Sequence, residues 1–189
     1  VEIEDLIEEE KMVVTLTKDG YVKRVPLSIY KTQNRGGKGV IATGTKDEDF
    51  VKDVFVASTH DNILCFTKNG VVHWLKVYNV PQGSRQSKGK AIVNLLNLND
   101  DSPSALVPLT SFESNKYLLF ATEKGNVKKT KLELYSHPRK GGIIAITLDN
   151  DDKLIDVMVT DGSHDLLLAT LKGAAIRFSE SEVRPTGRA

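Results

Sequence analysis

The residues from 33 to 39 carry the side chains in this sequence that are best suited to bind an anion. Two cations and three glycines fall within seven residues, which read Gln33-Asn34-Arg35-Gly36-Gly37-Lys38-Gly39. Glycine permits positive φ and a close approach of the backbone to a surface, and arginine and lysine commonly bind phosphate oxygens. The stretch contains no nucleophile or general base, so it is suited to holding a phosphate backbone and not to reacting with it.

A nucleotide-binding loop of the Walker type also combines glycines with a lysine. That motif requires Ser or Thr directly after the lysine and a helix after the loop. Here Lys38 is followed by Gly39 and then by an apolar run at residues 40–42. The sequence therefore argues against a Walker site.

Three later stretches repeat the combination of glycine with cations. Gly89 lies 19 residues after Gly70, just as Gly39 lies 19 residues after Gly20, and this register aligns Arg85 and Lys88 with the two cations of the first loop. The third copy is shorter, and the fourth surrounds a Pro-Thr-Gly sequence. These copies contribute the candidate phosphate contacts Arg85, Lys88, Lys90, Arg139, Lys140, Arg184 and Arg188.

The elements that must position these loops repeat about every fifty residues. A threonine stands three places before a turn glycine in each unit, and the successive spacings between the glycines are 50, 55 and 48 residues. The glycines are Gly20, Gly70, Gly125 and Gly173. Adjacent apolar residues before each turn predict a strand that is buried on both faces, and pairs such as Asp-Gly and Asn-Gly predict a tight hairpin.

The strand after each turn glycine is more polar. Arg24, Lys129 and Arg177 stand four places after their glycines, and Trp74 occupies the same place in the second unit. The recurrence predicts a basic stripe, although ordinary solvated strand ends are the alternative. The candidate contacts added on this ground are Lys23, Arg24, Lys128 and Lys129.

Two further strands are predicted after each of the first three loops. One is predicted at residues 40–42, 91–93 and 143–145, and the other at 51–56, 105–107 and 154–159. The loops that join them are acidic and are predicted to be solvated turns, because they lack the glycine and terminal glutamate of a calcium loop. Four strands in about fifty residues predict the blades of an all-β, propeller-like array.

The repeats predict one domain that spans residues 1–189. The blade-like units are 12–60, 61–114, 115–163 and an incomplete 164–189, after an acidic segment at 1–11. The array stops inside its fourth unit, which would leave a sheet edge unpaired. We therefore expect a fragment of a larger repeat domain, with about three and a half blades.

Charge is distributed unevenly along the chain. The formal net charge is +1, but residues 1–10 carry six acidic side chains and no basic one, which leaves +7 for residues 11–189. Such an acidic block predicts a solvated tail. The alternative is a segment that competes for the basic surface.

The remaining composition argues against several kinds of site. The single cysteine, Cys65, lies in an apolar run and is predicted to be a core residue, and one cysteine permits neither an internal disulfide nor a thiolate cluster. The four histidines show no ligand spacing, so we predict no metal site. No apolar run approaches the ~20 residues of a membrane span, and no signal-peptide pattern opens the chain. We expect a soluble intracellular protein.

The loop at 33–39 resembles the hallmark of the C-terminal domain of the DNA gyrase A subunit, Gln-Arg-Arg-Gly-Gly-Arg-Gly. In that comparison Lys38 is a conservative change, Asn34 departs, and the other five positions match. The resemblance covers the whole chain, including the stretches at 84–96 and 183–188. The related C-terminal domain of topoisomerase IV usually has a degraded form of this loop, so the resemblance favours gyrase.

The resemblance implies a six-bladed β-pinwheel in which neighbouring blades exchange strands. DNA wraps around the basic rim of such a domain, and the wrap lets an ATP-dependent type II topoisomerase introduce negative supercoils. The catalytic tyrosine, the ATP site and the magnesium site of that enzyme belong to other domains or to the partner protein. The resemblance therefore implies that this chain has no catalytic residue, cofactor or metal of its own.

The implied partners are double-stranded DNA, bound largely without sequence preference, the rest of the gyrase A protein, and the gyrase B protein in a complex of two copies of each. No membrane or small-molecule substrate is implied. The implied location is the bacterial cytoplasm, at the nucleoid, with an organelle not excluded.

Physical reasoning agrees with wrapping. Bending a duplex by 40–90° over 20–30 base pairs costs on the order of 1–6 kcal/mol, so several loops must act together. We expect Arg35 and Lys38 to be the leading contacts, followed by the cations at 85, 88 and 90. The other candidate cations could instead be ordinary surface residues that keep the protein soluble. Two further readings are a propeller that binds another protein and, least supported, an enzyme.

Overall fold

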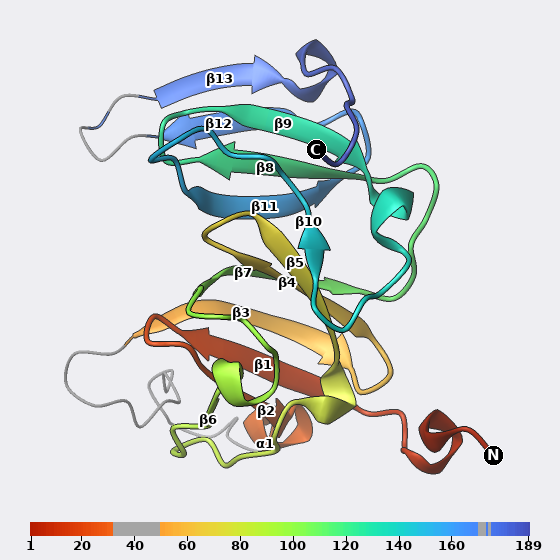
Figure 1. Cartoon of the computed structure of the whole chain (residues 1–189). Helices are drawn as coiled ribbons and strands as arrows, with labels where there is room; N and C mark the ends of the chain where they lie inside the picture. Colours follow the sequence, from red (N-terminus) through yellow and green to blue (C-terminus); the bar gives the residue numbers. More distant parts are fainter. Residues whose placement is uncertain (32–49, 170–172, 174) are drawn as a thin grey trace.

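The computed structural model describes residues 1–31, 50–169, 173 and 175–189 (Figure 1). The predicted loop of Gln33, Asn34, Arg35, Gly36, Gly37, Lys38 and Gly39 lies outside these residues. So do the predicted strand at 40–42 and the acidic loop at 47–49.

The described residues form an all-β structure, as predicted. The strands are β1 (Lys11–Thr17), β2 (Tyr21–Pro26), β3 (Val51–Ser58), β4 (Asn62–Thr67), β5 (Val71–Lys76), β6 (Lys90–Ala91), β7 (Pro103–Leu109), β8 (Tyr117–Thr122), β9 (Val127–Lys131), β10 (Ile143–Ile144), β11 (Leu154–Thr160), β12 (Asp165–Ala169) and β13 (Ala175–Ser179). The short helical turns are η1 (Ile3–Leu6), α1 (Ser28–Lys31), η2 (Val77–Asn79), η3 (Ile92–Asn94), η4 (Leu132–Tyr135) and η5 (Glu180–Glu182). None of the helices in the described ranges is long and apolar enough to cross a membrane.

The repeated threonine and glycine build the same hairpin turn in the first three units. In the β1–β2 turn, the hydroxyl of Thr17 accepts a hydrogen bond from the N–H of Tyr21 at 3.1 Å, and Gly20 has φ of 88°. Thr67 with Gly70, and Thr122 with Gly125, repeat both features. Only glycine adopts this left-handed conformation without cost, which explains why the two residues recur three places apart.

Each sheet of four strands takes one edge strand from the following repeat. The strand orders are β3-β1-β2-β6 and β10-β5-β4-β7, with β11-β8-β9 and β12-β13 as the smaller sheets. β6 pairs with β2 of the preceding unit, and β10 pairs with β5 of the preceding unit. This is the strand exchange that the resemblance implied.

The exchange corrects the strands predicted at 91–93 and 143–145. Only Lys90–Ala91 and Ile143–Ile144 are extended and paired, and each of them belongs to the sheet before its own repeat. The first of these strands ends early because the chain enters η3 at Ile92, where that side chain turns into the core and is fully buried.

A glycine directly precedes each exchanged strand, at the point where the chain comes close to the backbone of the strand with which it pairs. Gly89 has φ of 87°, and a Cβ there would lie 2.5 Å from the carbonyl oxygen of Val22. Gly142 has φ of 75°, and a Cβ there would lie 2.9 Å from the carbonyl oxygen of Val72. The glycines that end the second and third loops are therefore required by the exchange of strands.

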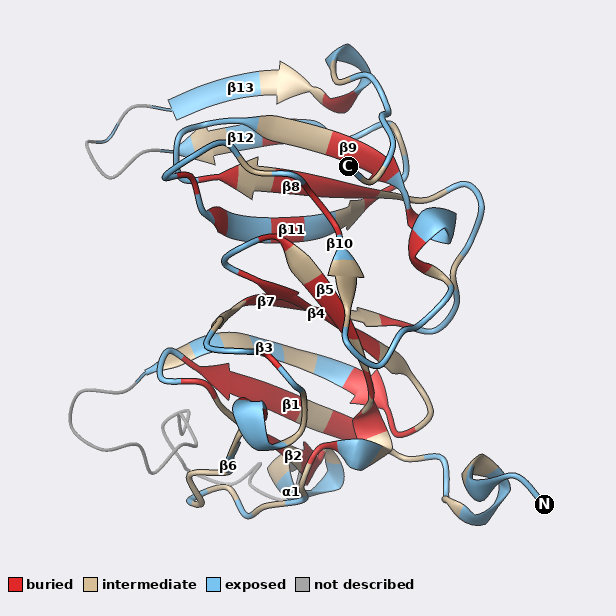
Figure 2. Cartoon of the chain, viewed as in Figure 1, coloured by how far each residue is buried: buried red, intermediate tan, exposed pale blue. Residues whose placement is uncertain are grey.

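Two hydrophobic cores lie between successive sheets (Figure 2). In β4, Ile63 and Cys65 belong to the core shared with the first sheet, whereas Leu64 and Phe66 belong to the core shared with the third. These four side chains are fully buried. The prediction of a strand buried on both faces is thus confirmed for β4, and burial raises the pKa of the Cys65 thiol to about 12.

The fourth sheet differs from the others. In β12, Leu166 is buried, but its neighbour Leu167 is 69% exposed, and Ile176 of β13 is 65% exposed. The prediction of burial on both faces is therefore wrong for β12. Within the described residues this sheet has two strands, and β13 is exposed or half-buried along its length (Figure 2).

The acidic N-terminal segment is only partly the solvated tail that its charge predicted. The hydroxyl of Thr59 donates to the carbonyl of Glu8 at 2.7 Å and accepts from the N–H of Glu10 at 3.1 Å. The ammonium of Lys76 forms an ion pair with Glu4 at 2.7 Å. The backbone at residues 8–10 is thus fixed to the turn between β3 and β4.

Candidate nucleic-acid interface

The predicted phosphate contacts fall into three groups by their exposure. Lys90, Arg139, Lys140 and Arg184 are exposed. Arg24, Arg85, Lys88, Lys128 and Arg188 are partly buried. Lys23 and Lys129 are buried, with 1% and 4% of their surface exposed.

Lys23 lies beneath the loop of the second repeat. Its ammonium donates hydrogen bonds to the carbonyl oxygens of Ser84, Arg85 and Ser87, each at 2.9 Å. Burial lowers the pKa of this ammonium below its usual range. The expectation that Lys23 contacts DNA is therefore corrected, because its charge is used inside the protein to shape the loop.

The two cations of that loop lie against aromatic rings. The guanidinium of Arg85 lies 5.3 Å from the ring centroid of Tyr30, and the ammonium of Lys88 lies 3.7 Å from that of Tyr21. Within the described part of the chain, neither takes part in an ion pair. A ring orients a cation without neutralising it, so both charges remain available to an anion.

In the first three units, the side chain four places after the turn glycine donates a hydrogen bond to the next repeat. The Nε of Arg24 donates to the carbonyl of Val80 at 2.7 Å, and the indole N–H of Trp74 donates to the carbonyl of Tyr135 at 2.8 Å. The ammonium of Lys129 lies 3.3 Å from the carbonyl of Glu180. What recurs is a long side chain with an N–H donor, which explains why a tryptophan can replace a cation.

The predicted basic stripe is therefore corrected at positions 24 and 129. Both side chains point into the connection between repeats, and burial lowers the pKa of the Arg24 guanidinium. In the fourth unit Arg177 instead forms an exposed ion pair with Asp165 at 2.7 Å.

Lys128 has the same relation to the fourth loop as Lys23 has to the second. Its ammonium donates to the carbonyl of Arg188 and, at 3.3 Å, to that of Ala145. Burial, and then the nearby Arg188, lower the pKa of this ammonium. His73 occupies the equivalent position in the second unit, where it is buried beside Gly142 of the third loop.

The second and fourth loops lie at the same register against β2 of the first sheet and β9 of the third sheet. Gln82 pairs with Arg24 of β2, and Pro185 pairs with Lys129 of β9. Both pairs join the residue four places after one glycine to the residue twelve places after the next. In the middle sheet, the exposed Arg139 and Lys140 line an open hollow of about 570 Å³ beside Trp74.

The acidic loop at 149–152 contains a buried carboxylate, contrary to the prediction that its residues form a solvated turn. Asp152 is 4% exposed. It accepts hydrogen bonds from the N–H groups of Lys124 and Lys153 at 3.0 and 2.9 Å and from the Asn126 amide at 3.2 Å. The carboxylate therefore closes the β8–β9 turn onto the acidic loop.

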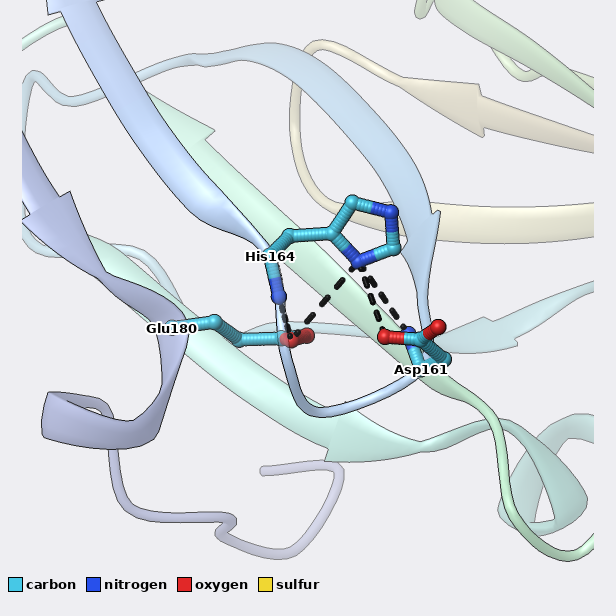
Figure 3. Close-up of side chains that lie close together, drawn as sticks. All are labelled: Asp161, His164 and Glu180. Atoms are coloured by element: carbon cyan, nitrogen blue, oxygen red, sulfur yellow. Dashed lines mark hydrogen bonds and ion pairs between the residues drawn. The ribbon is translucent and has the colours of Figure 1, made fainter.

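Asp161, His164 and Glu180 form a cluster that the sequence did not reveal (Figure 3). Their potential ligand atoms lie within 4.8 Å of one another. However, the Glu180 carboxylate accepts the N–H groups of Gly162 and His164, at 3.1 and 3.2 Å. Asp161 accepts both donors of Ser163, and these hydrogen bonds lower its pKa.

Glu180 thus caps the turn before β12 from a position that follows β13. The cluster was missed because Glu180 lies 16 residues from His164 and only the folded chain brings the two side chains together. The buried carboxylate of Glu180 therefore stabilises this turn through its two hydrogen bonds.

Comparison with known proteins identifies relatives of the chain. The sequence model of a family described as DNA gyrase C-terminal domain, beta-propeller, matches residues 11–58, 61–102, 116–161 and 164–189. The DNA gyrase A protein of Haemophilus influenzae is 47% identical over 189 residues, which are 100% of this chain and 22% of that protein. The chain thus spans about a fifth of the length of that curated relative.

Two solved structures are similar to the chain. The C-terminal domain of DNA topoisomerase IV superposes with a TM-score of 0.76 and 36% identity, over 96% of this chain and 55% of that chain. The DNA gyrase A C-terminal domain superposes with a TM-score of 0.73 and 26% identity, over 95% of this chain and 58% of that chain.

Proposed function

This chain belongs to the DNA gyrase C-terminal domain family, and from that membership we propose that it binds double-stranded DNA and bends it around its basic loops. The observation that carries the proposal is the repeated placement of those loops. The second and fourth loops pair with β2 and β9 of the preceding repeats, and the third loop leads into β10, which pairs with β5, so cations recur from one repeat to the next. A binding surface that repeats at intervals suits a long, sequence-independent phosphate backbone.

The surroundings of the cations in these loops support the same proposal. Arg85 and Lys88 lie against rings and not against carboxylates. Lys90, Arg139, Lys140 and Arg184 are exposed. Such cations release counterions when they meet phosphates, which is the main source of non-specific affinity for DNA.

In the whole enzyme, we propose, the bent duplex is passed to the strand-passing parts of a type II topoisomerase that introduces negative supercoils. Cleavage of DNA, ATP hydrolysis and magnesium binding then belong to the rest of the gyrase A protein and to the gyrase B protein. This chain contributes DNA binding without catalytic residues, and the complex acts in the cytoplasm.

A first experiment measures the affinity of the chain for duplexes of increasing length at several salt concentrations. We expect affinity to rise with duplex length, and log K to fall linearly with log salt with a slope of about −0.9 for each phosphate contact. The double variant Arg85→Ala, Lys88→Ala should reduce that slope by about 2. Lys153→Ala is the matched control, because Lys153 donates to Asn69 in the β4–β5 turn and lies outside the loops.

Affinity that is independent of both length and salt would contradict the proposal. That result would favour a propeller that binds another protein. Loss of affinity in the Lys153→Ala control would also count against the loops as the binding surface.

The C-terminal domain of topoisomerase IV is the second candidate, favoured by the similarity of the folds. Ligation of nicked circular DNA in the presence of the chain separates the two. A gyrase-type domain should shift the linking number in the positive direction, and Arg35→Ala with Lys38→Ala should abolish the shift. A shift that survives these substitutions, or is absent in the unmodified chain, would favour the second candidate.

A further inference from the structure

The buried ammonium of Lys23 fixes the direction of three peptide groups in the second loop. Three carbonyl oxygens, those of Ser84, Arg85 and Ser87, converge on this one nitrogen at 2.9 Å. In a planar trans peptide, the carbonyl of one residue points opposite to the N–H of the next. The N–H groups of Arg85, Gln86 and Lys88 must therefore point away from Lys23, toward the outer side of the loop.

The fourth peptide group of the loop is oriented in the other direction. The N–H of Ser87 donates to the carbonyl of Ser84 at 3.3 Å and to its hydroxyl at 3.1 Å, which closes the turn. No such acceptor within the described residues meets the N–H groups of Arg85, Gln86 and Lys88. The loop thus presents three donors outward and uses one donor internally.

The outward donors lie between two cations. Arg85 and Lys88 belong to the same five residues, and their side chains are held over the rings of Tyr30 and Tyr21. Ser84 and Gln86 are exposed, so the outer side of the loop is open. Successive backbone N–H groups form anion-binding concavities in proteins, and here the side chains add two positive charges.

We propose that residues 84–88 bind a DNA phosphate group through the backbone N–H groups of Arg85, Gln86 and Lys88, and that Lys23 is the residue that positions them. The proposal rests on the proposed function, because the phosphate is that of the bound duplex. It assigns the contact to backbone atoms, which no substitution of a surface cation alone would reveal. It also gives Lys23 a role in binding although its side chain never meets DNA.

The test is an NMR titration of the ¹⁵N-labelled chain with a short DNA duplex. The amide protons of Arg85, Gln86 and Lys88 should shift downfield as the duplex is added. The amide of Ser87 is the internal control, because its N–H is already bonded to Ser84. It should shift much less than its neighbours.

Lys23→Met then tests the positioning residue, since methionine keeps the apolar stem and removes the ammonium. We expect the three downfield shifts to disappear and the affinity to fall about tenfold, the effect of losing hydrogen bonds to a charged group. Lys153→Met removes the same charge outside the loops and should leave the three shifts in place. If Lys23→Met does not fold, Arg85→Pro is compared with Arg85→Ala, because only the proline variant removes the N–H as well as the guanidinium.

The outcomes separate the two proposals. Duplex binding without shifts at 85, 86 and 88, or shifts that persist in Lys23→Met, would overturn this inference and leave the proposed function intact. Equal affinities of Arg85→Pro and Arg85→Ala would overturn it as well. Failure of the unmodified chain to bind any duplex would overturn the proposed function, and this inference with it.

Discussion

Several buried charged residues in the described part of this protein hold the backbone in place. Lys23 directs three carbonyl groups of a loop, and Glu180 caps a turn with two N–H groups. Asp152 belongs to the same class. Buried polar groups of this kind are costly to leave unsatisfied, so their substitution should affect stability before it affects binding.

Asp152 should stabilise the protein at neutral pH and lose that effect in acid. Burial alone would raise its pKa, but the hydrogen bonds from Thr122, Lys124, Lys153 and Asn126 bring the pKa below the ordinary value of 3.8. A carboxyl group whose pKa is lower in the folded state stabilises that state above the unfolded pKa and ceases to do so as pH falls through the folded pKa.

We expect Asp152→Ala to lower the free energy of unfolding by about 1–3 kcal/mol at pH 7. Denaturant titrations over a pH series should show that difference shrinking below the ordinary carboxyl pKa. Asp151→Asn is the control, since Asp151 is exposed with φ of 63°, which asparagine tolerates. A difference that stays constant down to the lowest pH would contradict the assignment.

At the scale of elements, the exchanged strands β6 and β10 explain residues that look like binding features in the sequence. Glycine in a basic loop suggests a close approach to a ligand. In the second and third loops, however, the last glycine approaches the backbone of the neighbouring strand. The last glycine of each of these two basic loops is therefore required for strand pairing.

Two adjacent glycines of the third loop allow a matched test of this role. Gly142→Ala should lower the free energy of unfolding by about 2 kcal/mol or more, because alanine is strained at φ of 75° and its Cβ would lie 2.9 Å from the Val72 carbonyl. Gly141→Ala should change it by less than about 0.5 kcal/mol, since nothing lies within 4 Å of its added Cβ. Thermal unfolding of both variants checks this, and equal effects would show that the crossing does not require glycine.

The sequence predicted the hairpins and the repeat because their signals are local. Thr17 and Gly20 belong to a single turn, and their recurrence marks every unit. Strand exchange was not derivable from periodicity, since β6 has two residues and its partner lies in the preceding repeat. Burial of Lys23 was missed for a similar reason: the loop that covers it is some sixty residues away in the chain. At the neighbouring position of Arg24, one signal was available: Trp74 replaces the cation there in the second unit.

At the scale of the whole molecule, the sheets differ in how many neighbours they have. β4 is buried by cores on both sides, whereas β12 and β13, among the described strands, pair with each other alone and expose Leu167 and Ile176. Regions with few buried apolar contacts open at low free energy.

Amide hydrogen exchange should therefore be fastest, among the strands, in β12 and β13. We expect their backbone amides to exchange well before those of β4 and β8 in the isolated chain, measured by NMR or mass spectrometry. Equal protection in all four strands would mean that the fourth sheet is stabilised by contacts beyond those described.

Strand exchange also delays the completion of a sheet during synthesis on the ribosome. β2 ends at residue 26, but the strand that covers its edge begins at residue 90. At translation speeds of about 5–20 residues per second, that edge waits several seconds for its cover, and the edge of β5 waits similarly for β10. The unpaired edges of β2 and β5 can therefore mispair with other nascent chains until the following repeat has been synthesised.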